Sequence, residues 1–164
     1  MDTPEEKRVY LLTDARPIAI VVYCNDPRFQ KPIREFIGHD LGLQEGDYVP
    51  LVVPGSIASL TEPLRLPKEF KFMKERLEFM LDRFNTVKRI VLINHEDCRH
   101  YQMLGNSLGA IFLQHVQHMT ERQLRDLKLV SGTILALAAP GLQLEMYYAR
   151  IVKNGAVTVK FERV

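Results

Sequence analysis

The sequence predicts one α/β domain, a three-layer sandwich in which helices cover both faces of a mostly parallel sheet. Short β-branched apolar runs alternate with amphipathic helical stretches along the chain. The run at 18–23 is almost entirely apolar, and the strand predicted at 87–94 is apolar at 90–93, which is typical of strands buried on both faces. An Asn-Gly pair at 154–155 indicates a terminal hairpin and thus an antiparallel last strand. We predict the sheet order 2-1-3-4 with that antiparallel last strand, in a domain over 17–164 that follows an irregular polar arm at 1–16.

Composition excludes several classes of protein. The chain has 164 residues, which suits one domain with a sizeable core, and its 46% hydrophobic and 26% charged content argues against disorder. No apolar run reaches the roughly 18 residues that a membrane span needs. Residues 1–6 are polar and acidic, unlike a secretory signal, so a cytoplasmic location is expected. The net charge of +2 and the lack of a long Lys/Arg block predict no nucleic-acid partner and no membrane partner.

The first half of the domain begins with the strand at 18–23 and continues into a helix. Pro27 suits the first helical turn, and Gly38 or Gly42 ends the helix. A second strand follows at 48–53. Apolar side chains recur at helical spacing in the first helix, at Phe29, Ile33, Phe36 and Ile37.

The second half contains two helices that are predicted with different support. Apolar residues recur at helical spacing over 70–84, after a loop with Pro63 and Pro67, and this helix leads into the strand at 87–94. A helix within 103–118 is weakened by Gly105 and Gly109. The run Thr120-Glu121-Arg122-Gln123 resembles a capping box, so we predict that another helix starts there and ends near Ala139. The strands of the terminal hairpin are expected at 142–152 and 156–164.

Both cysteines of the chain follow predicted buried strands. Right-handed crossovers with the order 2-1-3 place the strands at 18–23 and 87–94 side by side. Their carboxyl ends then form the point where the chain winds both ways, which is where such sheets bind ligands. Cys24 follows the first of these strands, and His95 and Cys98 follow the other. We expect these three side chains to meet.

Cys24, His95 and Cys98 are candidate zinc ligands. Thiolate and imidazole are the ligands that zinc prefers, and three protein ligands leave a fourth tetrahedral position for water. His95 and Cys98 lie three residues apart, so both can reach one ion from a single turn. The chain has only 2 cysteines, which excludes a four-thiolate structural site. If a metal is bound, the donor count favours an open, catalytic site.

Asp26 and Arg28 are candidate catalytic residues beside this site. Bound zinc lowers the pKa of its water and supplies hydroxide as a nucleophile. Two thiolates cancel the charge of the ion, so better activity is expected at alkaline pH. Asp26 can accept a hydrogen bond from the zinc-bound water, and Arg28 can keep Asp26 ionised through a bidentate pair. If Arg28 turned away, Asp26 itself could become the fourth ligand and close the site.

Simpler interpretations exist for each residue. Cys24 can be a core residue, because free cysteine is among the most buried residue types. Asp26 before Pro27 is also a natural helix N-cap, and Arg28 can be a solvated surface residue. His100 can transfer protons near neutral pH, but a plain surface position is the preferred interpretation, as it is for the histidines at 115 and 118.

The combined pattern resembles the β-class carbonic anhydrases. That family has Cys-x-Asp-x-Arg after its first strand and His-x-x-Cys after its third, and this chain has Cys24-Asn25-Asp26-Pro27-Arg28 and His95-Glu96-Asp97-Cys98. The resemblance implies zinc on Cys24, His95 and Cys98, with a catalytic dyad of Asp26 and Arg28. It also implies reversible hydration of carbon dioxide to bicarbonate and a homodimer or higher homo-oligomer.

The sequence departs from the family pattern at three places, which suggests a short, divergent branch. The family usually has serine at the position of Pro27 and glycine at that of Arg99. A cation beside the second cysteine can crowd the pocket or attract bicarbonate. The run Val52-Val53-Pro54-Gly55 stands where the family often has Arg-Asn-Ala-Gly and retains only the glycine.

Several functions stay open at this point. The first is a zinc lyase that hydrates carbon dioxide, and a close variant is a hydrolase of a related small molecule such as carbon disulfide. The second is a zinc-binding module without turnover, which Arg99 and the altered 52–55 segment favour. The third is an α/β protein without a metal, in which both cysteines are buried core residues.

Overall fold

The computed structural model describes residues 10–12, 14–105, 112–137 and 140–164. Within these ranges, no helix combines the length and the apolar character that crossing a membrane requires. The elements in chain order are β1 (Ala19–Cys24), α1 (Pro27–His39), β2 (Tyr48–Val53), α2 (Ala58–Thr61), α3 (Pro67–Arg83), β3 (Arg89–His95), α4 (Arg99–Gly105), α5 (Phe112–Leu137), β4 (Gln143–Asn154) and β5 (Ala156–Arg163).

The strands form one five-stranded sheet with the order β2-β1-β3-β4-β5. The first four strands of that order are parallel to their neighbours, and β5 runs antiparallel to β4. The predicted order and the antiparallel last strand are therefore confirmed. In the register of β1 and β3, Tyr23 lies opposite Ile93, so the carboxyl ends of these two strands are neighbours.

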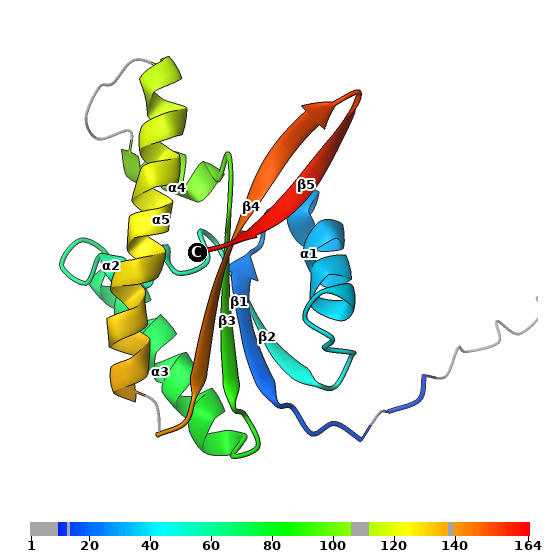
Figure 1. The fold of residues 1–164 in the computed structure, drawn as a ribbon. Helices are drawn as coiled ribbons and strands as arrows, with labels where there is room; N and C mark the ends of the chain where they lie inside the picture. The colour runs from blue at the N-terminus through cyan, green and yellow to red at the C-terminus, as the bar shows by residue number, and fades with distance from the viewer. Residues whose placement is uncertain (1–9, 13, 106–111, 138–139) are drawn as a thin grey trace, which may run out of the picture.

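Helices cover both faces of the sheet, with α1 on one side and α3 and α5 on the other (Figure 1). The six residues of β1 are all buried. Ile20 and Val22 pack with the core on the side of α3 and α5, whereas Val21 and Tyr23 pack with the core on the side of α1. This two-sided burial is the physical reason for the nearly continuous apolar run in the sequence.

Helix α1 contacts the sheet through the four apolar residues that the helical spacing selects. Phe29, Ile33, Phe36 and Ile37 are all buried. Phe36 stacks on Phe161 of β5, with the ring centroids 4.0 Å apart. Proline at the first turn and a side-chain cap from Asp26 begin the helix at the residue that the sequence predicts.

Two predictions about the helices are wrong. Helix α5 runs without a break from Phe112 to Leu137, so no helix begins at Thr120. Thr120 is buried, and its hydroxyl lies 3.1 Å from the Tyr148 hydroxyl of β4. This tertiary partner replaces the predicted capping role, and Gln123 is fully buried rather than reaching back to the helix start. The region predicted as a loop after β2 contains the short helix α2.

Helix α4 begins at Arg99, four residues before the predicted segment. Residues 106–111, which include Gly109, lie outside the described residues, as do 1–9 of the predicted arm. The terminal hairpin is confirmed, with Gly155 alone between β4 and β5 at a φ of 78°. Glycine adopts this left-handed conformation without strain.

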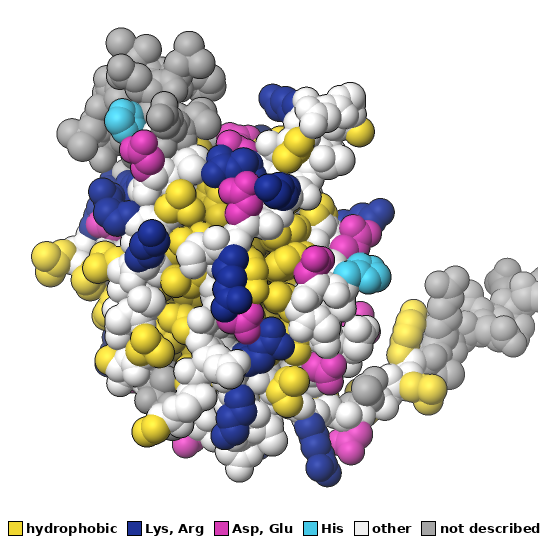
Figure 2. All heavy atoms as spheres, viewed as in Figure 1, with side chains coloured by type: hydrophobic (Ala, Val, Ile, Leu, Met, Phe, Trp, Pro, Cys, Tyr) yellow, Lys and Arg dark blue, Asp and Glu magenta, His cyan; other side chains and the backbone are white. Residues whose placement is uncertain are grey.

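The face shown in Figure 2 carries charged side chains of both signs around hydrophobic side chains in its middle. No block of a single charge dominates this view, in keeping with the net charge of +2.

Candidate metal centre

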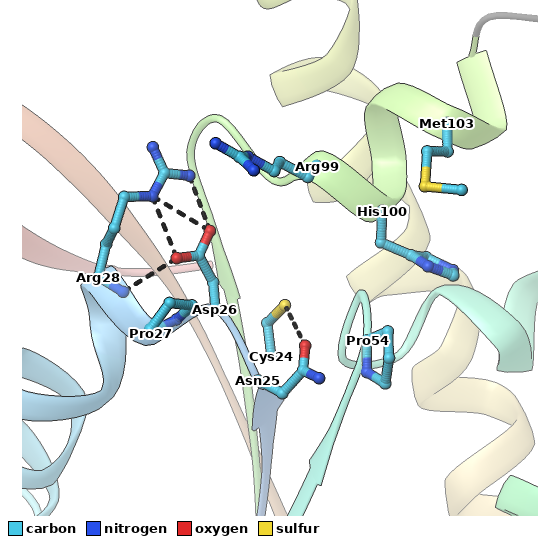
Figure 3. Close-up of a pocket in the computed structure, with 9 residues that line it drawn as sticks. All are labelled: Cys24, Asn25, Asp26, Pro27, Arg28, Pro54, Arg99, His100 and Met103. Carbon is cyan, nitrogen blue, oxygen red and sulfur yellow. Dashed lines mark hydrogen bonds and ion pairs between the residues drawn. The ribbon is translucent and has the colours of Figure 1, made fainter.

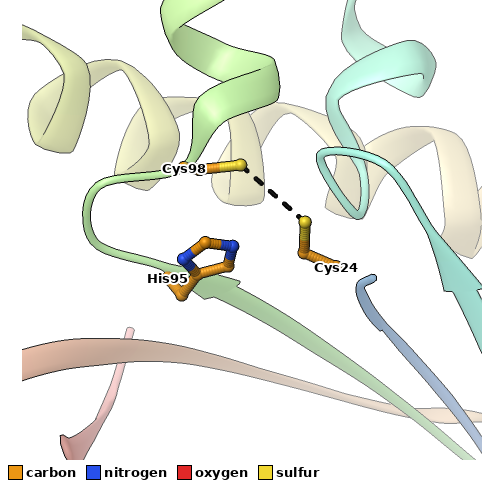
Figure 4. A group of neighbouring side chains, drawn as sticks. All are labelled: Cys24, His95 and Cys98. Carbon is orange, nitrogen blue, oxygen red and sulfur yellow. Dashed lines mark hydrogen bonds between the residues drawn. The ribbon is translucent and has the colours of Figure 1, made fainter. Parts of the chain in front are cut away.

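Cys24, His95 and Cys98 meet at the carboxyl ends of β1 and β3. Cys24 is the last residue of β1, and His95 is the last residue of β3. The chain then turns through Asp97, whose φ is 56°, and brings Cys98 back toward Cys24. The two sulfur atoms are 3.9 Å apart, and one ligand atom from each of the three side chains lies within 4.8 Å of the others (Figure 4). All three residues are buried.

The imidazole of His95 is held with one nitrogen toward the sulfurs (Figure 4). Nδ1 lies 2.8 Å from the carbonyl oxygen of Glu96, which assigns the ring proton to Nδ1. Nε2 is buried and has no hydrogen-bond partner among the described residues. Phe29 packs on the ring, with the centroids 4.1 Å apart. Histidine ligands of metals typically donate their other ring N–H to a carbonyl in this way.

The environment of the two thiols favours one negative charge between them. The hydrogen bond with Cys98 lowers the pKa of Cys24, and His95 and the backbone N–H of Gly55 act in the same direction against the opposing effect of burial. The Gly55 nitrogen lies 3.3 Å from the Cys24 sulfur. The hydrogen bond with Cys24 raises the pKa of Cys98, and burial raises it further. The second proton is therefore hard to lose unless a cation replaces it.

The donor set fits zinc. Two sulfurs bound at about 2.3 Å to one tetrahedral ion lie about 3.8 Å apart, close to the separation found here. The unpartnered Nε2 of His95 supplies the third donor. Within the described residues, Asp26 does not belong to the group of converging ligand atoms. The three residues would thus leave one coordination position open.

Asp26 is held beside this group by Arg28, from the first turn of α1 (Figure 3). One carboxylate oxygen of Asp26 accepts the backbone N–H of Arg28 at 3.0 Å, so Asp26 caps the helix. The same carboxylate accepts Nη2 of Arg28 at 2.7 Å and Nε at 3.1 and 3.2 Å. The hydrogen bond from the guanidinium lowers the pKa of Asp26. The capping role and the pairing with Arg28, which the sequence left as alternatives, are both present.

A pocket of about 400 Å³ opens beside Cys24. It is bounded by the residue after Cys24, the start of α1, the turn after β2 and the first turns of α4 (Figure 3). Arg99 lines this pocket and is exposed. The residues that line it are Cys24, Asn25, Asp26, Pro27, Arg28, Pro54, Arg99, His100 and Met103.

His100 does not have the surface position that the sequence analysis preferred. Its Nε2 is buried without a hydrogen-bond partner among the described residues, and burial lowers its pKa. The ring lines both the pocket beside Cys24 and a second pocket of about 300 Å³ on the side of α3. His118, in contrast, is exposed as predicted.

The ring of His100 also lies in close contact with Gly55. A Cβ added at Gly55 would lie 2.3 Å from Cδ2 of the imidazole. Gly55 has a φ of 71° and donates to the Cys24 sulfur, so it combines a left-handed backbone with two close contacts. These contacts give a physical reason for the one glycine that the 52–55 segment shares with the family pattern. Sequence spacing offers no signal for the contact between His100 and Gly55, because 45 residues separate them.

No protein-family model matches this sequence, and no curated protein matches it. Solved structures do resemble it. One of two tetrameric β-carbonic anhydrases from the filamentous ascomycete Sordaria macrospora is 18% identical, with a TM-score of 0.56 over 88% of this chain and 83% of that chain. The β-carbonic anhydrase isoform I from Trichomonas vaginalis is 16% identical, with a TM-score of 0.53 over 93% of this chain and 87% of that chain. These likenesses show that the chain has the β-carbonic anhydrase fold.

Proposed function

We propose that this protein binds one zinc ion through Cys24, His95 and Cys98 and catalyses the reversible hydration of carbon dioxide to bicarbonate. The observation that carries the proposal is the convergence of two sulfurs and one unpartnered imidazole nitrogen within 4.8 Å. Bound zinc supplies the chemistry of water activation, because it lowers the pKa of a coordinated water toward neutrality. The other groups of the reaction come from the chain itself.

Asp26 is the residue that orients water in this proposal. Its carboxylate lines the pocket beside Cys24, and its side chain is only 8% exposed. Arg28 lowers the pKa of this carboxyl, so Asp26 is ionised at neutral pH and accepts hydrogen bonds but donates none. A water that donates one hydrogen bond to Asp26 has its lone pairs directed elsewhere in the pocket, where it can attack the carbon of carbon dioxide.

Arg99 supports binding of the anionic product. Its side chain lines the same pocket, and within the described residues no ion pair joins it to a carboxylate. Arg28 carries one positive charge and pairs with two carboxylates, those of Asp26 and Asp97, whereas Arg99 has no such pair within the described residues. The guanidinium of Arg99 can therefore donate hydrogen bonds to bicarbonate as it leaves or enters.

A zinc-binding module without turnover is the second candidate. The observation that favours it is the 52–55 segment, where Val52 and Val53 stand in place of the arginine and asparagine of the family pattern and Pro54 lines the pocket. Valine and proline side chains offer no hydrogen bond to a substrate. In this version Arg99 holds an anion in the pocket without a reaction.

We also propose a cytoplasmic homo-oligomer. The fold neighbours from Sordaria macrospora are described as tetrameric, which supports self-association of this chain. Light scattering on the purified protein would measure its mass, and a monomer across the accessible concentration range would refute this part of the proposal.

The test of the main proposal is metal analysis followed by stopped-flow carbon dioxide hydration from neutral to alkaline pH. We expect about one zinc per chain and turnover that rises with pH. Asp26→Ala should reduce kcat by about 10²-fold or more, since positioned acid–base groups contribute 10²–10⁴-fold. The exposed Asp82→Ala is the matched control and should leave kcat unchanged. Stoichiometric zinc without turnover would support the module instead, and absence of zinc would refute both versions.

A further inference from the structure

Arg28 contacts Asp97 as well as Asp26. Its Nη1 donates to the carboxylate of Asp97 at 2.7 Å, and its Nη2 donates to the Asp97 backbone carbonyl at 2.9 Å. One guanidinium thus joins the cap of α1 to the turn between His95 and Cys98. We propose that Asp97 is a positioning residue that keeps Arg28 on Asp26 and so keeps the carboxylate of Asp26 away from the metal position. This inference rests on the proposed zinc site.

Asp97 is itself fixed from a second element. Gln102 of α4 donates its side-chain amide to the other carboxylate oxygen of Asp97 at 2.7 Å. The φ of 56° at Asp97 is unusual for a residue other than glycine, although aspartate and asparagine tolerate it best. Both carboxylate oxygens and the backbone carbonyl of Asp97 are therefore engaged, by side chains from α1 and α4.

The contact with Asp97 matters because it joins Arg28 to a second segment of the chain. The side chains of Arg28 and Asp97 are 44% and 43% exposed, and a single exposed ion pair typically contributes only about 0–1 kcal/mol to stability. The contact therefore depends on geometry, with both the carboxylate and the backbone carbonyl of Asp97 accepting from the guanidinium. Contacts to Asp97 at two further nitrogen–oxygen pairs limit the orientations that Arg28 can adopt.

Release of Arg28 would change what Asp26 can do. Asp26 lies two residues after Cys24 and at the wall of the same pocket, and carboxylate oxygens are accepted zinc ligands. Without its guanidinium partner, Asp26 gains by binding the ion at the open position. Asp97 thus determines whether that position is available to an external ligand.

A role for Asp97 in the turn alone predicts a different outcome. If only the left-handed backbone matters, Asp97→Gly should be harmless, because glycine adopts this conformation most easily. Asp97→Asn should also be harmless, because asparagine tolerates the conformation and keeps the size of the side chain. A positioning role predicts that both substitutions release Arg28, because neither keeps the negative charge.

The experiment replaces zinc with Co²⁺ and titrates thiocyanate, followed by visible absorption. In the unsubstituted protein we expect cobalt–thiolate bands that change when thiocyanate enters the open position. Asp97→Gly and Asp97→Asn should weaken thiocyanate binding by about tenfold or more, the factor that corresponds to one charge-assisted hydrogen bond. Adding Asp26→Asn to either variant should restore thiocyanate binding, since asparagine keeps the helix cap but is a poorer ligand.

Asp82→Asn is the control for loss of one carboxylate and should bind thiocyanate normally. Thiocyanate affinity within twofold of the unsubstituted protein in Asp97→Asn would overturn the inference, as would failure of Asp26→Asn to restore binding. These readouts do not depend on turnover, so they hold if the protein proves to be a module without activity. A protein that binds no cobalt through thiolates would refute the proposed metal site and this inference together.

Discussion

Two buried regions of the molecule contain polar atoms without a hydrogen-bond partner among the described residues, and the two regions differ in the chemical groups that carry those atoms. The candidate metal centre brings two sulfurs and the Nε2 of His95 together at the end of the sheet. The second region, here called the buried polar cluster, consists of Asn94, Tyr101, Gln123 and Asp126, where α4 and α5 cover the end of β3. Among the described residues, hydrogen-bond partners are missing for Asn94 Oδ1, Gln123 Nε2, Gln123 Oε1 and Asp126 Oδ2.

The chemistry of the donors separates the two regions. Thiolate and imidazole are soft or borderline ligands that suit zinc, and the metal centre offers them from three residues. The buried polar cluster offers amide and carboxylate groups, a mixture of donors and acceptors that suits ordered water. Burial raises the pKa of Asp126, which reduces the negative charge that a cation would need there. A missing hydrogen-bond partner therefore does not by itself indicate a metal site. The chemical type of the unpartnered groups decides between a metal ion and ordered water.

The largest expected effect tests the metal centre. Cys98→Ser replaces a thiolate with a hydroxyl, a poor zinc ligand, and should lower zinc affinity by at least about 100-fold, the upper range for loss of a supporting residue. Competition with a chromophoric chelator measures this. Cys24→Ser should give the same result. Unchanged zinc affinity in either variant would remove the distinction between the two regions.

A second prediction concerns the contact of Gly55 with His100. Gly55→Ala places a Cβ 2.3 Å from the imidazole, and Gly42→Ala has a similar φ, 66° against 71°, but open space around the new atom. Both should lose about 1–2 kcal/mol of stability to backbone strain, and Gly55→Ala should lose about 1–3 kcal/mol more to overpacking. Urea unfolding measures both. Equal losses would mean that His100 moves aside without cost.

A third prediction concerns the buried polar cluster. We expect ordered water to bind the buried amide of Gln123, so Gln123→Leu should destabilise the protein by about 1–3 kcal/mol, the cost of leaving the partners of that water unpaired. Equilibrium unfolding in urea is the measurement, and leucine at the exposed Gln143 is the control. A gain in stability would show that the cluster is dry.

The smallest effect is expected at the edge of this cluster. Thr120→Val removes the hydrogen bond to Tyr148 and should cost about 1 kcal/mol. Burial raises the pKa of Tyr148 to about 12, and the hydrogen bond with Thr120 partly offsets this, so the variant should ionise at higher pH. Because the folded pKa exceeds that of the unfolded chain, ionisation removes stability as the pH rises above about 10. Ultraviolet titration of tyrosinate, run beside the unsubstituted protein, checks the direction, and a lower pKa in the variant would contradict it.

Local patterns in the chain were sufficient for the strands, and together with an assumed strand order they predicted the meeting of Cys24, His95 and Cys98. The apolar runs end where the strands leave the core, and parallel neighbours with buried faces have few possible arrangements. The ends of β1 and β3 had to be close once that order was assumed, so the 4.8 Å cluster follows from the sheet. The position of these ligand-type residues directly after the two apolar runs was visible in the sequence, and it predicted the site.

The tertiary structure decided the roles of Thr120, His100 and Asp97. Thr120 resembles a helix cap in sequence, but packing of α5 against β4 gives its hydroxyl a partner on Tyr148 and continues the helix. His100 is partly buried because the turn containing Gly55 lies against its ring, and Asp97 contacts Arg28 across 69 residues of sequence. These roles depend on which surfaces pack together. The spacing of side chains along the chain does not predict contacts between segments that are distant in sequence.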